Sequence, residues 1–149
     1  MTGFETLIAF DPIKAYSISL SATVYSSVID AFEVTNLYPV ASTYTADKQS
    51  LISGNIKLNQ KIRLKKNTDI QLSSYYLAPD LIPQGTTNGR FSLDIGIKKT
   101  YGKHEFSLNA TDLLNTLVIR KTIQGNGFRY ISRDYYETQV IRLGYAYKF

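Results

Sequence analysis

The chain has 149 residues, 44% of them hydrophobic, with no cysteine, no tryptophan and a single histidine. These counts exclude disulfide frameworks, thiolate nucleophiles and clusters of zinc or transition-metal ligands, so we expect no cofactor. The formal charge of +5 is carried by lysines and arginines scattered singly along the chain, so we expect no nucleic-acid partner.

The start of the chain carries no export signal. The first ten residues have no basic leader, no long apolar core and no small-residue cleavage site. No stretch approaches the roughly 20 consecutive apolar residues of a transmembrane helix, so a membrane protein with this sequence would cross the bilayer as β-strands. We therefore expect a fragment of an exported protein, one that has lost its start.

Strict alternation of apolar and polar residues dominates the sequence. In residues 14–29, for example, Tyr16, Ile18 and Leu20 alternate with serines. Alternating segments occur, in chain order, at residues 4–10, 14–29, 51–64, 70–76, 91–98, 104–110 and 139–149. No stretch has helical periodicity. The pattern predicts an all-β fold, an antiparallel meander of about seven strands in a single domain spanning residues 1–149.

The connections between these segments alternate in length. Residues 11–13, 65–68 and 102–103 read as tight turns, whereas residues 30–48, 79–89 and the region around Gly125-Asn126-Gly127 read as long connections. Such sorting is typical of an outer-membrane barrel, which has short periplasmic turns and long extracellular loops. Tyrosines gather near predicted strand ends, and the last strand ends on Phe149, which favours a lipid-facing apolar stripe over a soluble interior.

The closing segment, residues 137–149, resembles the last strand of TonB-dependent receptors and related outer-membrane barrels. In that family a terminal aromatic residue, preceded by apolar residues at alternate positions, is a signal for the barrel assembly machinery. The resemblance assigns this signal to Leu143, Tyr145, Tyr147 and Phe149.

A second motif strengthens the resemblance. Asp112, Leu113, Leu114 and Asn115 follow a predicted strand and look like the family's tetrad at the penultimate strand. Residues 75–79 and 85–99 are similar to the preceding hairpin of a Bacteroidetes-type branch. The resemblance covers residues 49–149 well and 1–48 more loosely. The family's plug and most of its roughly 22 strands are absent, so it implies the C-terminal segment of a transmembrane barrel.

Charged residues of the polar stripes are interpreted as lumen-facing. They are Lys57, Lys61, Arg63, Asp94, Lys98, Glu105 and Arg142. Paired charges inside a barrel explain them better than acid–base chemistry, because no nucleophile accompanies them. The Asp112 tetrad reads more simply as a local break in strand pairing than as a ligand loop. We therefore predict no catalytic, cofactor-binding or metal-binding residue, and no enzyme.

The leading hypothesis is the C-terminal barrel segment of a TonB-dependent transporter in the cell outer membrane, importing a bulky nutrient such as a metal chelate or glycan. Its partners would be outer-membrane lipid, the remaining barrel and plug, the barrel assembly machinery and, through the plug, the TonB system. Two alternatives remain open. One is a soluble exported β-sandwich that binds a ligand, and the other is a small autonomous outer-membrane barrel closed by pairing of residues 4–10 with the last strand.

Overall fold

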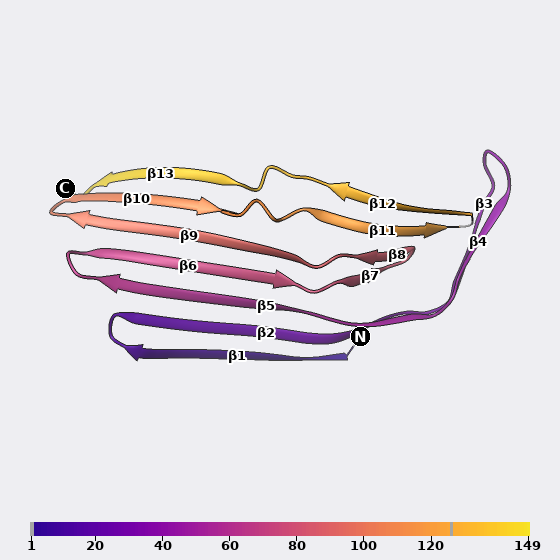
Figure 1. Cartoon of the computed structure of the whole chain (residues 1–149), viewed down its shortest axis with the longest axis horizontal. Helices are drawn as coiled ribbons and strands as arrows, with labels where there is room; N and C mark the ends of the chain where they lie inside the picture. The colour runs from indigo at the N-terminus through magenta and orange to yellow at the C-terminus, as the bar shows by residue number, and fades with distance from the viewer. Residues whose placement is uncertain (1, 126) are drawn as a thin grey trace.

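The computed structural model describes residues 2–125 and 127–149, which form β-strands and connections without a helix. Seven strands make one antiparallel sheet in the order β1-β2-β5-β6-β9-β10-β13 (Figure 1). Their bounds are β1 Thr2–Ile13, β2 Tyr16–Ile29, β5 Gln49–Leu64, β6 Thr68–Leu77, β9 Arg90–Tyr101, β10 His104–Thr111 and β13 Val140–Tyr147. All seven alternating segments of the sequence lie in this sheet. Within the described residues, no helix is long and apolar enough to cross a membrane.

The strand register gives the sheet two faces of opposite character. Residues directly opposite each other on paired strands share a face, and side chains alternate between faces along each strand. One row runs Ile8, Leu20, Leu58, Ser74, Leu93, and the next row, on the opposite face, runs Ala9, Ser19, Asn59, Ser73, Asp94. We call these the apolar face and the polar face.

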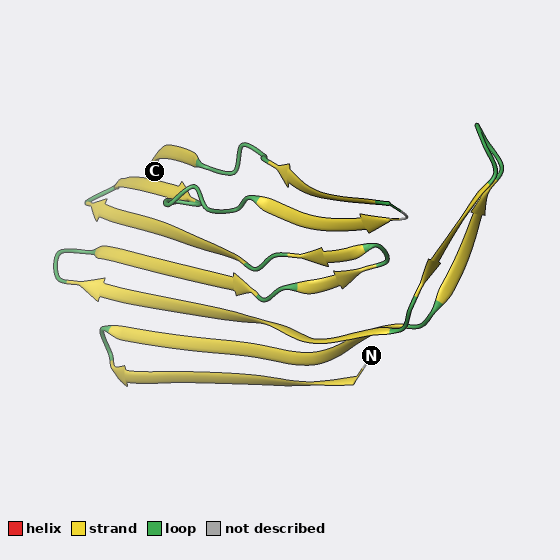
Figure 2. Ribbon diagram, turned by 45° about the vertical axis from the view of Figure 1, so that its right-hand side comes forward, coloured by secondary structure: helices red, strands yellow, loops and turns green. Residues whose placement is uncertain are grey.

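The apolar face has no second layer of described residues against it. Figures 1 and 2 show a single sheet, with no element packed on it to form a sandwich. Only two hydrophobic residues of the described chain are buried, Ala46 and Ala110, whereas Leu143 is 83% exposed. The buried polar residues are Ser53, Ser92 and Asp112. This distribution is inverted relative to a water-soluble domain, so the structure does not favour the β-sandwich.

The predicted sorting of connections is confirmed. Tight turns join β1 to β2, β5 to β6 and β9 to β10 at one end of the sheet, and the long connections lie at the other end (Figure 1). Lys66 and Asn67 adopt left-handed backbone conformations, with φ of 63° and 53°, as a tight hairpin turn between twisted strands requires. The prediction of a turn at residues 11–13 is wrong. β1 continues to Ile13 through a register shift after Phe10, and the turn falls at residues 14–15.

The long connections contain three further hairpins that the sequence did not predict. They are β3 (Phe32–Asn36) with β4 (Ser42–Ala46), β7 (Asp80–Ile82) with β8 (Gly85–Thr87), and β11 (Ile119–Gly125) with β12 (Phe128–Asp134). The last two associate into a four-stranded sheet of order β12-β11-β8-β7. Asn126, in the predicted glycine-rich turn, lies outside the described residues. The last strand runs from Val140 to Tyr147, so Phe149 lies just beyond it.

The seven-stranded sheet does not close into a barrel. β1 and β13 are its two edges, and no pairing between them is present in the described chain. The small closed barrel, which requires that pairing, is therefore not favoured.

Candidate functional site: the polar face of the sheet

The polar face carries all of the charged residues that were interpreted as lumen-facing. They are Lys57, Lys61, Arg63, Asp94, Lys98, Glu105 and Arg142, and each is in register with residues of that face. They come from four strands of the sheet, β5, β9, β10 and β13, and strand alternation brings them to one surface.

Ion pairs gather at the tight-turn end of this face. Lys98 Nζ lies 2.7 Å from Glu105 Oε1, and Lys148 Nζ lies 3.3 Å from Glu105 Oε2. Lys61 Nζ lies 3.9 Å from Asp69 Oδ2. Sequence reasoning missed Lys148 and Asp69, because cross-strand neighbours are set by register.

Four basic residues of the face have no carboxylate partner among the residues described. They are Lys57, Arg63, Arg90 and Arg142. Since the face holds more cations than paired anions, its potential is positive and attracts anionic groups.

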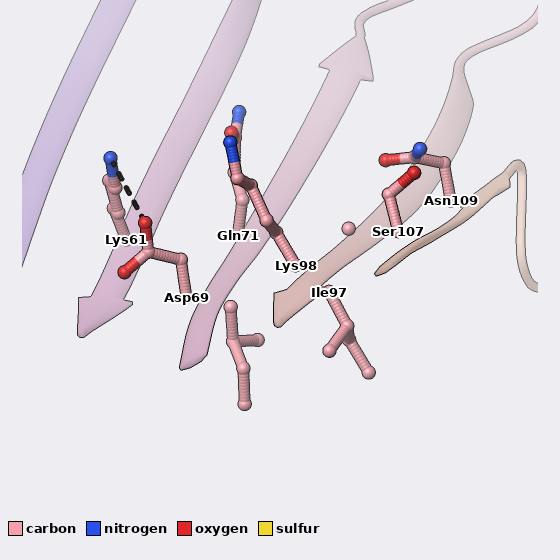
Figure 3. A pocket seen from close by; sticks show the side chains of 9 residues that line it. Lys61, Asp69, Gln71, Ile97, Lys98, Ser107 and Asn109 are labelled. Carbon is pink, nitrogen blue, oxygen red and sulfur yellow. Dashed lines mark ion pairs between the residues drawn. The ribbon is translucent and has the colours of Figure 1, made fainter. Parts of the chain in front are cut away.

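Two adjoining hollows lie on the polar face. The first, of about 270 Å³, includes Lys61, Asp69, Lys98 and Asn109 in its lining (Figure 3). The second, of about 260 Å³, lies further along the strands and shares Gln71, Gly96 and Asn109 with the first. Gly96 deepens both because it has no side chain. In Figure 3, Ile97 points away from the labelled polar side chains, toward the apolar face.

The Asp112 tetrad lies directly after β10, where strand pairing stops. Asp112 is 1% exposed, and its carboxylate accepts three hydrogen bonds. The donors are the backbone N–H of Thr116 at 2.9 Å, the backbone N–H of Leu117 at 3.2 Å and the hydroxyl of Thr138 at 2.6 Å. Asp112 and Asn115 have φ of 44° and 52°, a left-handed region that Asp and Asn enter more easily than most residues. The tetrad is thus a tight loop wound around a buried carboxylate.

This loop fastens neighbouring strands together. The N–H of Asp112 donates to Asp94 Oδ1 at 2.8 Å, and the N–H of Leu113 donates to the carbonyl of Leu93 at 2.7 Å, so the loop is tied to β9. On its other side, Gln139 Nε2 donates to the carbonyl of Leu113 at 3.1 Å. Asp94, interpreted from the sequence as a lumen charge, is therefore also an anchor for the loop.

The carboxyl of Asp112 stays ionised under ordinary conditions. Burial disfavours the charged form, but the hydrogen bonds from Thr138, Thr116 and Leu117 outweigh burial and hold the pKa of Asp112 below its usual value. A buried carboxylate with its lone pairs satisfied is a structural element, which agrees with a loop that holds strands rather than a proton-transfer site.

At the long-connection end of the polar face, the β7–β8 hairpin is held over the sheet. The hydroxyl of Tyr25, on β2, donates to Asp80 Oδ2, on β7, at 2.6 Å, and the N–H of Ala78 donates to the carbonyl of Gly54 at 2.8 Å. Ser53, opposite Tyr25, is 3% exposed. The hairpin therefore covers part of the polar face near the long connections.

Replacing Tyr25 with phenylalanine should loosen this hairpin while leaving the sheet intact. A hydrogen bond to a charged group contributes about 1.5 to 3 kcal/mol. Its loss here should lower the free energy of local unfolding of residues 80–87. Amide hydrogen exchange should become faster in β7 and β8 and stay unchanged in β9 and β10. Equal exchange of residues 80–87 in the two proteins would show that the Tyr25–Asp80 bond does not hold the hairpin.

The aromatic residues of the last strand lie on the apolar face. Tyr145 is opposite Phe106, with ring centroids 5.3 Å apart, and its hydroxyl lies 2.8 Å from His104 Nδ1. Tyr147 contacts the rings of His104 and Phe149, with centroids 5.2 and 5.4 Å apart. Leu143 follows on the same face toward the middle of β13. The structure thus places the predicted assembly signal in one exposed aromatic and apolar stripe, and its use in assembly stays a prediction.

In a comparison with protein families, the chain matches the model of the outer membrane protein beta-barrel family over residues 1–147. The chain belongs to this family. Comparison with curated proteins gave no match, and comparison with solved structures gave none. Family membership implies localisation in the outer membrane, and it explains why this barrel protein exposes its apolar face and buries serines and an aspartate.

The described part of this barrel chain holds no group of three or more His, Cys, Asp or Glu side chains placed to bind a metal ion. Its polar face carries mixed charges and hydroxyls, as a surface lining a wet space does.

Proposed function

We propose that residues 1–149 form one partial barrel domain, the C-terminal segment of the wall of a TonB-dependent outer-membrane transporter. The observation that carries the proposal is a single-layer sheet with an apolar and a polar face and two unpaired edges. One face meets lipid and the other meets the water-filled lumen.

The unpaired edges support a wall with further strands. In hydrocarbon no water satisfies the backbone N–H and C=O groups of an edge strand, and each unsatisfied group costs several kcal/mol. Without further strands, β1 and β13 would each present a row of these unsatisfied groups to the hydrocarbon. Strands from the rest of the barrel, on both sides, remove this cost.

In this proposal each part of the chain has a distinct role. The apolar face contacts outer-membrane lipid, and the polar face, with its excess of cations, lines the lumen and faces the plug. The β3–β4, β7–β8 and β11–β12 hairpins are extracellular loops. Leu143, Tyr145, Tyr147 and Phe149 are read by the barrel assembly machinery. The transported solute is a bulky nutrient such as a metal chelate or glycan, and the wall takes no part in a chemical reaction.

Uptake with and without energy coupling tests this function. The whole transporter that contains residues 1–149, expressed in the outer membrane of a Gram-negative host, should allow concentrative uptake of a compound from a panel of ferric chelates and oligosaccharides. That uptake should fall to background in an otherwise identical host lacking TonB. Uptake that is the same in the two hosts would indicate a passive pore and contradict the proposal.

A further inference from the structure

A groove on the apolar face lies near the tight-turn end of β9, β10 and β13. It has a volume of about 400 Å³, and its lining includes Ile97, Leu108 and Leu143 in one row across the three strands. The next row toward the turn is Lys99, Phe106 and Tyr145, which also line the groove. The groove is thus apolar along its length, with an ammonium group at one end.

Lys99 is exceptional on this face. Among the paired residues of the seven described strands, it is the only Lys, Arg, Asp or Glu in register with the apolar face. It is exposed, and no described carboxylate forms an ion pair with it. A lipid-facing charge is costly at the bilayer midplane and tolerated near the interface, which places Lys99 at headgroup depth.

The row beyond Lys99 marks the same depth. It consists of Tyr101, His104 and Tyr147, which are opposite one another on the three strands. The His104 ring also lies beside the Tyr145 hydroxyl. Phenol and imidazole groups favour the interface because one part is apolar and another forms hydrogen bonds. Since tight turns of outer-membrane barrels are periplasmic, this interface belongs to the inner leaflet, which is built of phospholipid.

We propose that this groove is a binding site for one anionic phospholipid of the inner leaflet, with an acyl chain along Ile97, Leu108 and Leu143 and the phosphate group at Lys99. Charge complementarity selects this occupant. The ammonium of Lys99 needs an anion, no side-chain carboxylate is in register with the apolar face in the described strands, and the rows on either side match an acyl chain and a headgroup. A peptide partner would leave its backbone polar groups unsatisfied against an apolar floor in lipid. The inference depends on the orientation of the apolar face and is independent of what the barrel transports.

Native mass spectrometry of the protein, purified from outer membranes in mild detergent, tests the site. Phosphatidylglycerol and phosphatidylcholine with identical acyl chains are titrated separately. Since one lysine near an anionic headgroup contributes about fivefold in affinity, the wild-type protein should bind phosphatidylglycerol about fivefold more tightly than phosphatidylcholine. Lys99→Gln should lower phosphatidylglycerol affinity about fivefold, to the phosphatidylcholine level, and Lys99→Arg should retain it.

Lys14→Gln is the matched control, because Lys14 lies in the β1–β2 turn at the same end of the sheet, with β2, β5 and β6 between it and the groove. It should leave the affinity unchanged. An equal loss in Lys14→Gln and Lys99→Gln would show diffuse electrostatic attraction and overturn the site. Equal affinity of the wild-type protein for the two lipids would overturn it as well, whether or not the variants fold.

Discussion

Replacing Asp112 with alanine should lower the free energy of unfolding of the barrel by about 2 to 4 kcal/mol. The change leaves the backbone N–H groups of Thr116 and Leu117 without their acceptor in a buried loop, and each such group costs about 1 to 3 kcal/mol. It also removes the acceptor for the Thr138 hydroxyl, which ties the segment before β13 to the loop. The measurement is the midpoint of denaturant unfolding of the purified protein in detergent micelles. The folded fraction is read from heat-modifiable migration on a gel.

Asp47→Ala provides the control for Asp112→Ala. Asp47 is exposed in the connection between β4 and β5, so the same change of side chain there should alter the unfolding free energy by less than about 0.5 kcal/mol. Similar midpoints for the two variants would mean that the buried carboxylate does not fasten β9 to the segment before β13.

An arginine at Ile56 should destabilise the barrel in lipid by about 2 to 4 kcal/mol, whereas an arginine at the neighbouring Asn55 should cost less than about 1 kcal/mol. Both residues lie near the middle of β5, Ile56 on the apolar face opposite Ala22 and Asn55 on the polar face opposite Thr23. The two substitutions introduce the same charge and differ only in the face that carries it. The measurement is the unfolding midpoint of each variant reconstituted in phospholipid vesicles.

The comparison between these two arginine variants is informative in either direction. A larger loss for Asn55→Arg than for Ile56→Arg would mean that the polar face meets the lipid. Equal losses would mean that the two faces meet similar surroundings, as in a soluble sheet.

The seven strands of the large sheet were predictable from the sequence for a physical reason. A strand with one face in lipid and the other in water needs apolar residues at every second position, and residues 16–24 and 55–64 keep this pattern with few exceptions. Once alternation is known, the assignment of Lys57, Lys61 and Arg142 to one face follows without knowledge of the register.

The hairpins of the long connections lack this signal. β3 and β4, and β7 and β8, are short, and they pair outside the two-faced sheet, so nothing imposes strict alternation on them. Part of their pairing is long-range, such as β8 with β11, and its sequence separation hides it from inspection of the chain. The turn at residues 11–13 was misplaced for a related reason. Asp11 and Pro12 favour a turn, but they occupy an irregular position in the edge strand β1, where a missing N–H is tolerated.

The Asp112 loop was visible as a motif, but its role was not. The contacts that define it reach Asp94, 18 residues away, and Thr138, 26 residues away. Such contacts depend on which strands are neighbours and in what register. The sequence alone does not show that this aspartate is buried, or that its carboxylate accepts hydrogen bonds both from its own loop and from the segment before β13.

The central claim is that the apolar face meets lipid and the polar face meets water, and site-directed spin labelling tests it most directly. The chain has no cysteine, so single cysteines at Leu20 and Ser21 in β2 and at Ile97 and Lys98 in β9 can each carry a label. With the protein in a bilayer, labels at Leu20 and Ile97 should collide more often with oxygen, and labels at Ser21 and Lys98 more often with a water-soluble nickel complex. Preferential access of the nickel complex to positions 20 and 97 would contradict the account.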